Sequence, residues 1–105
     1  MRVISKPRLR GFWRRHPEAE APLKTWWKIA IRARWATIAD VRATFPHADA
    51  VTLKCGTTVT VFNVGGNKFR LIVAIVYHAH TVYIKHVLTH SEYDAESWKA
   101  QICRE

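Results

Sequence analysis

The sequence predicts an α+β protein in which N-terminal helices pack on one face of a curved antiparallel β-sheet. Apolar residues recur at helical spacing in the first part of the chain and follow strand-like patterns from residue 50 onward. The chain has 105 residues, 49% of them hydrophobic and five of them Trp, which excludes a disordered basic tail. We therefore expect a single domain over residues 1–105, built on one hydrophobic core.

A short strand is expected at residues 2–5, and the first helix follows it. Pro7 suits the first turn of a helix, because its missing N–H would have no helical acceptor there. Pro17 ends this helix. Its apolar stripe has i, i+3, i+4, i+7 spacing and consists of Leu9, Phe12, Trp13 and His16.

The second helix has Pro22 near its start and two contrasting faces. Its apolar stripe is formed by Leu23, Trp26, Trp27, Ala30 and Ile31. A basic stripe runs along the other side, through Lys24, Lys28 and Arg32. Such a stripe is commonly just solvated charge. The functional alternative is that Lys28, Arg32 and Arg34 extend an RNA-binding surface.

A third, short helix is predicted to start at Thr37 and to stop before Pro46, because Thr37 and Asp40 have the spacing of a capping box. Three strands follow at Thr58–Val64, residues 69–77 and residues 81–88. The glycines of residues 65–67 predict a hairpin turn, and residues 78–80 a second one. Residues 92–104 are expected to form a turn or one short helix anchored by Trp98.

Alternation along the strands assigns side chains to faces. Arg70 and Lys85 are expected to meet on the open face, while His86 and Leu88 point to the helix-covered face. Lys68 lies at the edge of the open face. The open face is expected to form a groove, and His90 and Tyr93 are expected to close one end of it.

The charge of the chain favours an anionic partner. It has 17 Lys and Arg against 8 Asp and Glu, a net charge of +9, and it has no carboxylate between Asp49 and Glu92. Nucleic acid, an anionic membrane surface and an acidic protein all remain compatible with this. No window approaches the roughly 20 apolar residues that span a bilayer, and no signal peptide is recognised. We therefore expect a cytoplasmic protein that does not associate with a membrane. Cys55 and Cys103 are then expected to be reduced thiols.

The candidate residues match the needs of a metal-free ribonuclease. A base takes the proton of the 2′-OH, an acid protonates the leaving oxygen, and cations stabilise the charged phosphorane. His90 can exchange protons near neutral pH, and Arg70 can bind phosphate oxygens bidentately. Lys68 and Lys85 add positive charge, and Tyr93 can stack on a base. The paired histidines His78/His80 and His86/His90 make only a weak candidate for a metal site, so neither a metal site nor a cofactor is expected.

Several segments resemble the HigB family of toxins from bacterial toxin–antitoxin pairs. The main ones are FNVGGNKFRLI at residues 62–72 and YIKHVLTHSEYD at residues 83–94. Residues 2–5, 16–20 and 39–45 are also similar to that family, so the resemblance extends from Met1 to about Trp98. Residues 52–57 make a longer segment than the family leads us to expect, and no function is assigned to them.

The resemblance implies a RelE-like fold and an endonuclease that cuts translated mRNA at the ribosome. It also implies a HigA-type antitoxin that binds the toxin and represses their shared operon. Residues that match the catalytic pattern of RelE-like enzymes are Arg70, His90 and Tyr93, with Lys68 as a helper. Which of them is the acid and which the base stays open.

Two other classes of protein fit the same composition. A non-catalytic RNA-binding or ribosome-associated module, or an inactive toxin remnant, would need the basic surface without an acid/base pair. A DNA-binding domain is the other alternative, although the sequence contains no helix-turn-helix signature.

Overall fold

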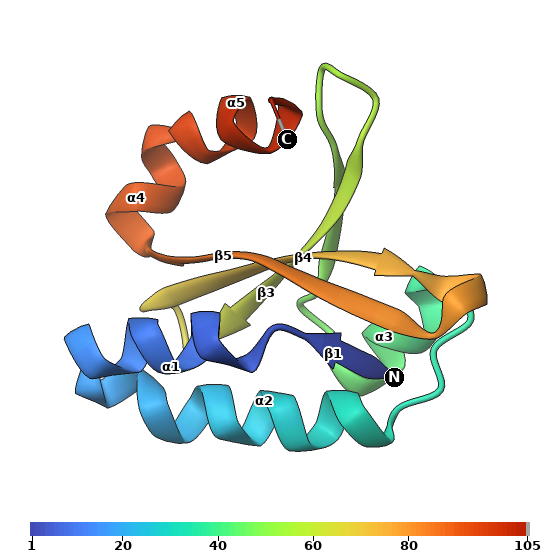
Figure 1. Ribbon diagram of the computed structural model, residues 1–105, viewed down its shortest axis with the longest axis horizontal. Coiled ribbons are helices and arrows are strands. Elements are labelled where there is room, and N and C mark those ends of the chain that lie inside the picture. Colours follow the sequence, from blue (N-terminus) through green and yellow to red (C-terminus); the bar gives the residue numbers. More distant parts are fainter. Residues whose placement is uncertain (105) are drawn as a thin grey trace.

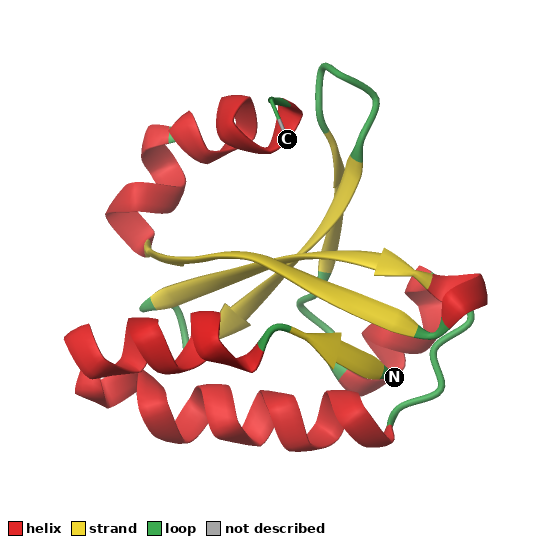
Figure 2. Ribbon diagram, in the orientation of Figure 1, coloured by secondary structure: helices red, strands yellow, loops and turns green. Residues whose placement is uncertain are grey.

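A computed structural model describes residues 1–104, in which helices lie on both sides of a five-stranded sheet (Figures 1 and 2). The strands are β1 (Arg2–Ile4), β2 (Asp49–Thr52), β3 (Thr58–Val64), β4 (Phe69–Val76) and β5 (Thr81–Thr89). The helices are α1 (Lys6–Arg15), α2 (Glu20–Arg32), α3 (Ile38–Thr44), α4 (His90–Ala95) and α5 (Ser97–Cys103). Short 3₁₀ turns occur at η1 (Pro17–Ala19) and η2 (Tyr77–Ala79). The predicted α+β class is confirmed.

The sheet has the order β1-β5-β4-β3-β2. Strands β2 to β5 form an antiparallel meander. At the edge, however, β1 pairs with β5 in parallel, with Arg2 opposite Thr81. A parallel pair needs a long crossover connection, and the helices and strands between β1 and β5 provide it. The sheet is therefore mixed, whereas the sequence predicted only antiparallel pairing.

The three N-terminal helices cover one face of the sheet, as expected. Their apolar stripes bury Leu9, Phe12, Leu23, Trp26 and Val41 against strand residues Phe62, Phe69, Leu71, Val73, Val82 and Ile84. The predicted capping box of Thr37 and Asp40 opens α3. One residue of the predicted α2 stripe departs from it: Ile31 is 38% exposed.

The second face of the sheet is not left open, which corrects our expectation. The chain forms two helices after β5, α4 and α5, and they pass over this face (Figure 1). On α5, Trp98 and Ile102 lie one turn apart and are both buried. They complete a second apolar cluster with Leu53, Val59, Val61 and Ile72. Part of this face is therefore buried in a second hydrophobic core.

A β-bulge in β5 corrects the predicted assignment of residues to faces. Ile72 lies opposite His86, but the next residue, Val73, lies opposite Ile84, so Lys85 is the extra residue. A bulge reverses the alternation beyond it. As a result His86 and Leu88 lie on the face of Ile72, not on the face covered by α1 to α3. Leu88 is the residue opposite Arg70.

Cys55 and Cys103 form a disulfide, so the prediction of two reduced thiols is wrong for this structure. Their Cα atoms are 5.8 Å apart although the residues are 48 positions apart in sequence. The hairpin loop between β2 and β3 brings Cys55 to the end of α5. The chain has two cysteines and so one possible pair, but nothing in the sequence shows that this loop and the end of α5 meet. Within residues 1–104, no helix is long and apolar enough to cross a membrane.

Candidate functional site

The site is formed where β4 begins and β5 ends, next to the turn between β3 and β4. Gly65 and Gly66 both adopt left-handed backbone conformations, with φ of 64° and 68°. A Cβ on Gly65 would also lie 3.3 Å from the ring of Phe69. Glycine is favoured at such positions because it has no side chain to clash. The turn directs the chain back through Lys68 and Arg70 toward the end of β5.

Arg70 is half-buried in β4 and is held by backbone carbonyls. Its Nη1 donates to the carbonyl oxygens of Asn67 at 3.1 Å and Phe69 at 3.2 Å. On its other side the guanidinium carbon lies 5.5 Å from the ring centre of Tyr93. Carbonyls and an aromatic face orient a guanidinium without cancelling its charge. An arginine fixed in this way is suited to bind a phosphate group.

Helix α4 brings His90 to the same place. Thr89 caps the helix: its hydroxyl accepts from the backbone N–H of Glu92 at 3.2 Å, and its own N–H donates to the Glu92 carboxylate at 2.9 Å. The backbone N–H of His90 donates to the carbonyl of Lys68 at 3.1 Å. That bond joins the start of α4 directly to the residue before β4.

His90 has a carboxylate partner one helical turn away. Its Nδ1 lies 2.9 Å from Oδ2 of Asp94, and both side chains are about half exposed. With Nδ1 donating its proton to Asp94, Nε2 becomes the ring nitrogen that can exchange a proton with a substrate. Asp94 thus defines both the orientation of the ring and the atom that would do the chemistry.

Tyr93 lies between Arg70 and α5. Its ring stacks on the ring of Trp98 at a centroid distance of 5.5 Å and an interplanar angle of 15°. The Trp98 indole N–H donates to the Tyr93 carbonyl at 3.1 Å. Arg70, Tyr93 and Trp98 therefore form a continuous stack from the site into the second apolar cluster.

The structure brings together four predicted residues, Lys68, Arg70, His90 and Tyr93, but not Lys85. Instead of meeting Arg70, Lys85 lies at the bulge beside α1, where Arg8 Nη1 donates to its carbonyl at 2.7 Å. There it borders a hollow of about 300 Å³, lined also by Arg8, Gly11, Phe12, Arg15, His86 and Val87. This second basic area was missed, although Arg8 and Arg15 have the i, i+7 spacing of one helical face.

The basic residues of the second predicted helix form a surface of their own. Lys28, Arg32 and Arg34 are exposed. Helix α2 lies on the opposite side of the sheet from α4, with α1 and the sheet between them (Figure 1). Arg32 and Arg34 border another hollow of about 760 Å³, together with Arg2 and His80. These cations do not extend the His90 site; they define a separate surface.

Nothing in residues 1–104 gathers three or more His, Cys, Asp or Glu side chains into a possible metal site. The acid/base candidate is instead paired with a single carboxylate, Asp94. Sequence analysis missed Asp94 as a partner, although i, i+4 spacing from His90 would have indicated it once α4 was known to begin at His90.

The role of Asp94 gives a first prediction. We expect Asp94→Asn to lower kcat for RNA cleavage by about tenfold, because an amide orients the imidazole less strongly than a carboxylate does. The measurement is a cleavage rate at saturating substrate. Glu96→Gln is the matched control, since Glu96 is an equally exposed carboxylate that pairs with Lys99 instead. Equal losses in the two variants would contradict a specific role for Asp94.

The fold and the site define a small basic α+β protein with an Arg, His, Tyr and Lys cluster suited to RNA phosphate chemistry. Residues 19–96 match the HigB toxin family, described as the RelE-like toxic component of a toxin–antitoxin system. The chain therefore belongs to the HigB toxin family.

Curated relatives extend this similarity over nearly the whole chain. The mRNA interferase HigB of Escherichia coli O6:H1 (strain CFT073) is 29% identical over 94 residues, covering 90% of this chain and 89% of the relative. The mRNA interferase toxin HigB of Escherichia coli K12 is 28% identical, with coverages of 90% and 88%. The same identity and coverages are found for the mRNA interferase HigB of Shigella flexneri.

Proposed function

We propose that this protein is an mRNA interferase, the toxin of a toxin–antitoxin pair, and that it cleaves mRNA engaged with ribosomes in the cytoplasm. The observation that carries the proposal is the convergence of Arg70, His90, Tyr93 and Lys68 at one end of β4 and β5. The names of its relatives and its family support the same activity.

In the proposed reaction the 2′-oxygen of one nucleotide attacks its own 3′-phosphate, and the bond from phosphorus to the 5′-oxygen breaks. The products are a 2′,3′-cyclic phosphate and a 5′-hydroxyl end. One proton leaves the 2′-OH and another is delivered to the departing 5′-oxygen. His90 Nε2 is placed to perform one of these transfers, because Asp94 holds Nδ1.

Stabilisation of the charge is assigned to the cations of the site. Arg70 donates to the phosphate oxygens as negative charge develops on them, and Lys68 adds a second positive charge at the turn. Tyr93, stacked against Trp98, offers one edge of its ring and its hydroxyl to the RNA. The proposed mechanism uses no metal or cofactor, because His90 takes part in proton transfer and Arg70 and Lys68 stabilise the developing charge.

The remaining basic surfaces are suited to ribosomal RNA and to the message outside the scissile bond. Lys28, Arg32 and Arg34 would hold RNA from the α2 side, and Lys85 would do so together with Arg8 and Arg15. Contacts of this kind increase affinity with little choice of sequence, because they reach only phosphates.

A prediction tests the hollow between α1 and β5. The quantity to measure is the slope of the logarithm of the association constant for single-stranded RNA against the logarithm of the salt concentration. We expect the double variant Arg8→Ala/Arg15→Ala to make this slope less steep by about 1.4, or about 0.7 for each lost phosphate contact. Arg10→Ala/Arg14→Ala is the matched control: it removes the same charge from exposed positions of α1 outside the hollow. If both double variants change the salt dependence equally, the hollow is not a specific RNA contact.

The partner that neutralises the toxin is proposed to be a HigA-type antitoxin. The +9 charge of the chain favours an acidic partner that covers part of the basic surface. Release of the antitoxin would then expose the site.

Purified protein provides the test. The protein is incubated with mRNA, either free or engaged with translating ribosomes. We expect cleavage only when ribosomes are present. Cleavage of free mRNA at the same rate would refute ribosome dependence. RNA binding without cleavage in any condition would favour the non-catalytic module instead.

A further inference from the structure

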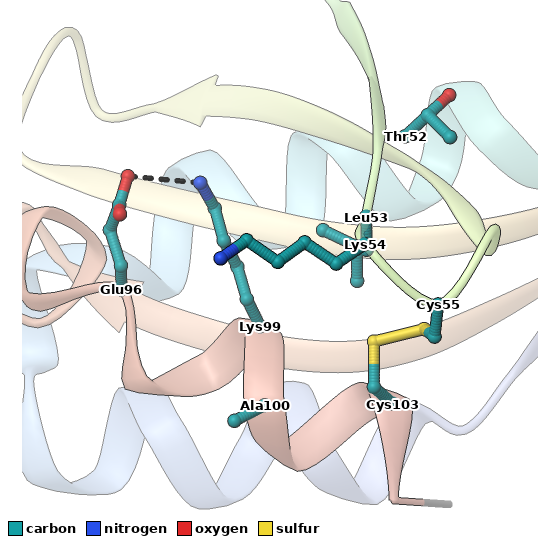
Figure 3. Close-up of a pocket in the computed structure, with 8 residues that line it drawn as sticks. All are labelled: Thr52, Leu53, Lys54, Cys55, Glu96, Lys99, Ala100 and Cys103. Atoms are coloured by element: carbon teal, nitrogen blue, oxygen red, sulfur yellow. Dashed lines mark hydrogen bonds and ion pairs between the residues drawn. A yellow bond between two sulfur atoms is a disulfide. The ribbon is translucent and has the colours of Figure 1, made fainter.

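No catalytic group of the proposed reaction lies in the hairpin loop between β2 and β3 or on helix α5, yet these two segments are covalently joined. Cys55 lies in the loop and Cys103 is the last residue of α5; their disulfide closes one side of a pocket of about 660 Å³ (Figure 3). The loop is itself structured, because Leu53 N–H donates to the Thr57 carbonyl at 2.8 Å. It is also the segment that is longer than the family resemblance predicts.

Helix α5 contains Trp98, the residue that packs behind Tyr93 of the site. Trp98 is 2% exposed, packs in the cluster with Leu53 and Ile72, and stacks on Tyr93, whose ring in turn faces Arg70. The indole N–H bond to the Tyr93 carbonyl fixes α5 against α4. Trp98 therefore touches the site only through Tyr93.

On its own α5 is too short to be stable. It has seven residues, fewer than the roughly 12–15 that an isolated helix needs in water. Two buried side chains, Trp98 and Ile102, and the disulfide at its last residue hold it in place. Loss of the disulfide would leave α5 attached through the apolar contacts and α4 alone.

We propose that Trp98 is a positioning residue for Tyr93 and Arg70, and that the Cys55–Cys103 disulfide keeps α5, and hence Trp98, in the catalytically productive position. This inference rests on the proposed function. It adds a redox dependence to it: the oxidised protein is the more active form.

The chemistry is thiol–disulfide exchange with a dithiol reductant. One thiolate of the reductant attacks a sulfur of the Cys55–Cys103 bond and forms a mixed disulfide; its second thiolate then displaces the remaining protein sulfur. The protein gains two electrons and two protons as two thiols, and the reductant leaves as a disulfide. Cys55 is exposed and Cys103 half-buried, so the bond is accessible to such a reagent.

The test is the ribosome-dependent cleavage assay, with kcat and KM determined separately for folded protein. We expect Trp98→Leu, which keeps an apolar side chain but loses the stacking and the N–H, to lower kcat by about 10- to 100-fold with little change in KM. Trp98→Phe should recover most of the lost kcat, because it restores the stacked ring. The matched control is Trp35→Leu: Trp35 is equally buried, at 2% exposure, but lies in the other core.

Reductant tests the second half of the proposal without any substitution. A dithiol should lower the kcat of the wild-type protein, and reoxidation should restore it, whereas Cys55→Ser/Cys103→Ser should be low throughout and insensitive to the reagent. The proposal is overturned if reduction leaves kcat unchanged, or if Trp98→Leu and Trp35→Leu lose stability but not kcat. Failure of the proposed function itself looks different, because the oxidised wild-type protein would then cleave nothing.

Discussion

Arg70→Ala is expected to reduce kcat for mRNA cleavage by about 10²–10³-fold, the usual loss when one donor to a developing oxyanion is removed. Arg70 is fixed within the site by two carbonyl oxygens and the ring of Tyr93. Its charge is therefore preorganised, and no other described side chain lies in the same position. The measurement is a single-turnover cleavage rate at saturating protein.

Two further variants make this expectation specific. Arg70→Lys should recover only part of the lost rate, because an ammonium cannot bind two phosphate oxygens with the fixed geometry of a guanidinium. Arg10→Ala removes the same charge from an exposed position of α1 and should leave the rate close to that of the wild-type protein. A normal rate in Arg70→Ala would show that the site has been assigned to the wrong strand.

The second large effect concerns stability. Removing the disulfide with Cys55→Ser/Cys103→Ser should lower the free energy of unfolding by about 4 kcal/mol, the loop-closure contribution for a bond between residues 48 positions apart. Such a loss is a large fraction of the roughly 5–15 kcal/mol that stabilises a typical protein. Urea denaturation of the oxidised wild-type protein and of the double variant measures it.

Reduced wild-type protein provides the control for that experiment. It lacks the same covalent bond but keeps both sulfur atoms, so its stability should match that of the double variant. A difference of less than about 1 kcal/mol between oxidised and reduced protein would mean that the unfolded chain is not constrained by the bond, contrary to the loop-closure account.

Local patterns predicted most of the fold. Helix stripes such as that of Leu23, Trp26 and Ala30, and the strand around Phe69, depend on spacing within a few residues, which sequence shows directly. The parallel pairing of β1 and the second core formed by Trp98 and Ile102 depend on contacts between distant segments. Spacing along the chain contains no information about such contacts.

The site shows the same division. Lys68, Arg70, His90 and Tyr93 were predicted as a group because a turn and two strand ends join them, and the structure does bring them together. The prediction that Arg70 and Lys85 meet was wrong, because a single extra residue in β5 reverses which side chains of that strand lie on each face of the sheet. At that residue α1 contacts the strand, because Arg8 Nη1 donates to the Lys85 carbonyl, and spacing along the chain shows neither the bulge nor this contact.

The most direct test of the central claim, that this protein cuts translated mRNA with Arg70 at its site, is the mapping of mRNA 5′ ends in a bacterial host. Wild-type protein and Arg70→Ala would each be induced without an antitoxin. The account predicts growth arrest with new 5′-hydroxyl ends inside translated regions for the wild-type protein, and neither effect for Arg70→Ala. Growth arrest without new ends, or the same ends with Arg70→Ala, would contradict it.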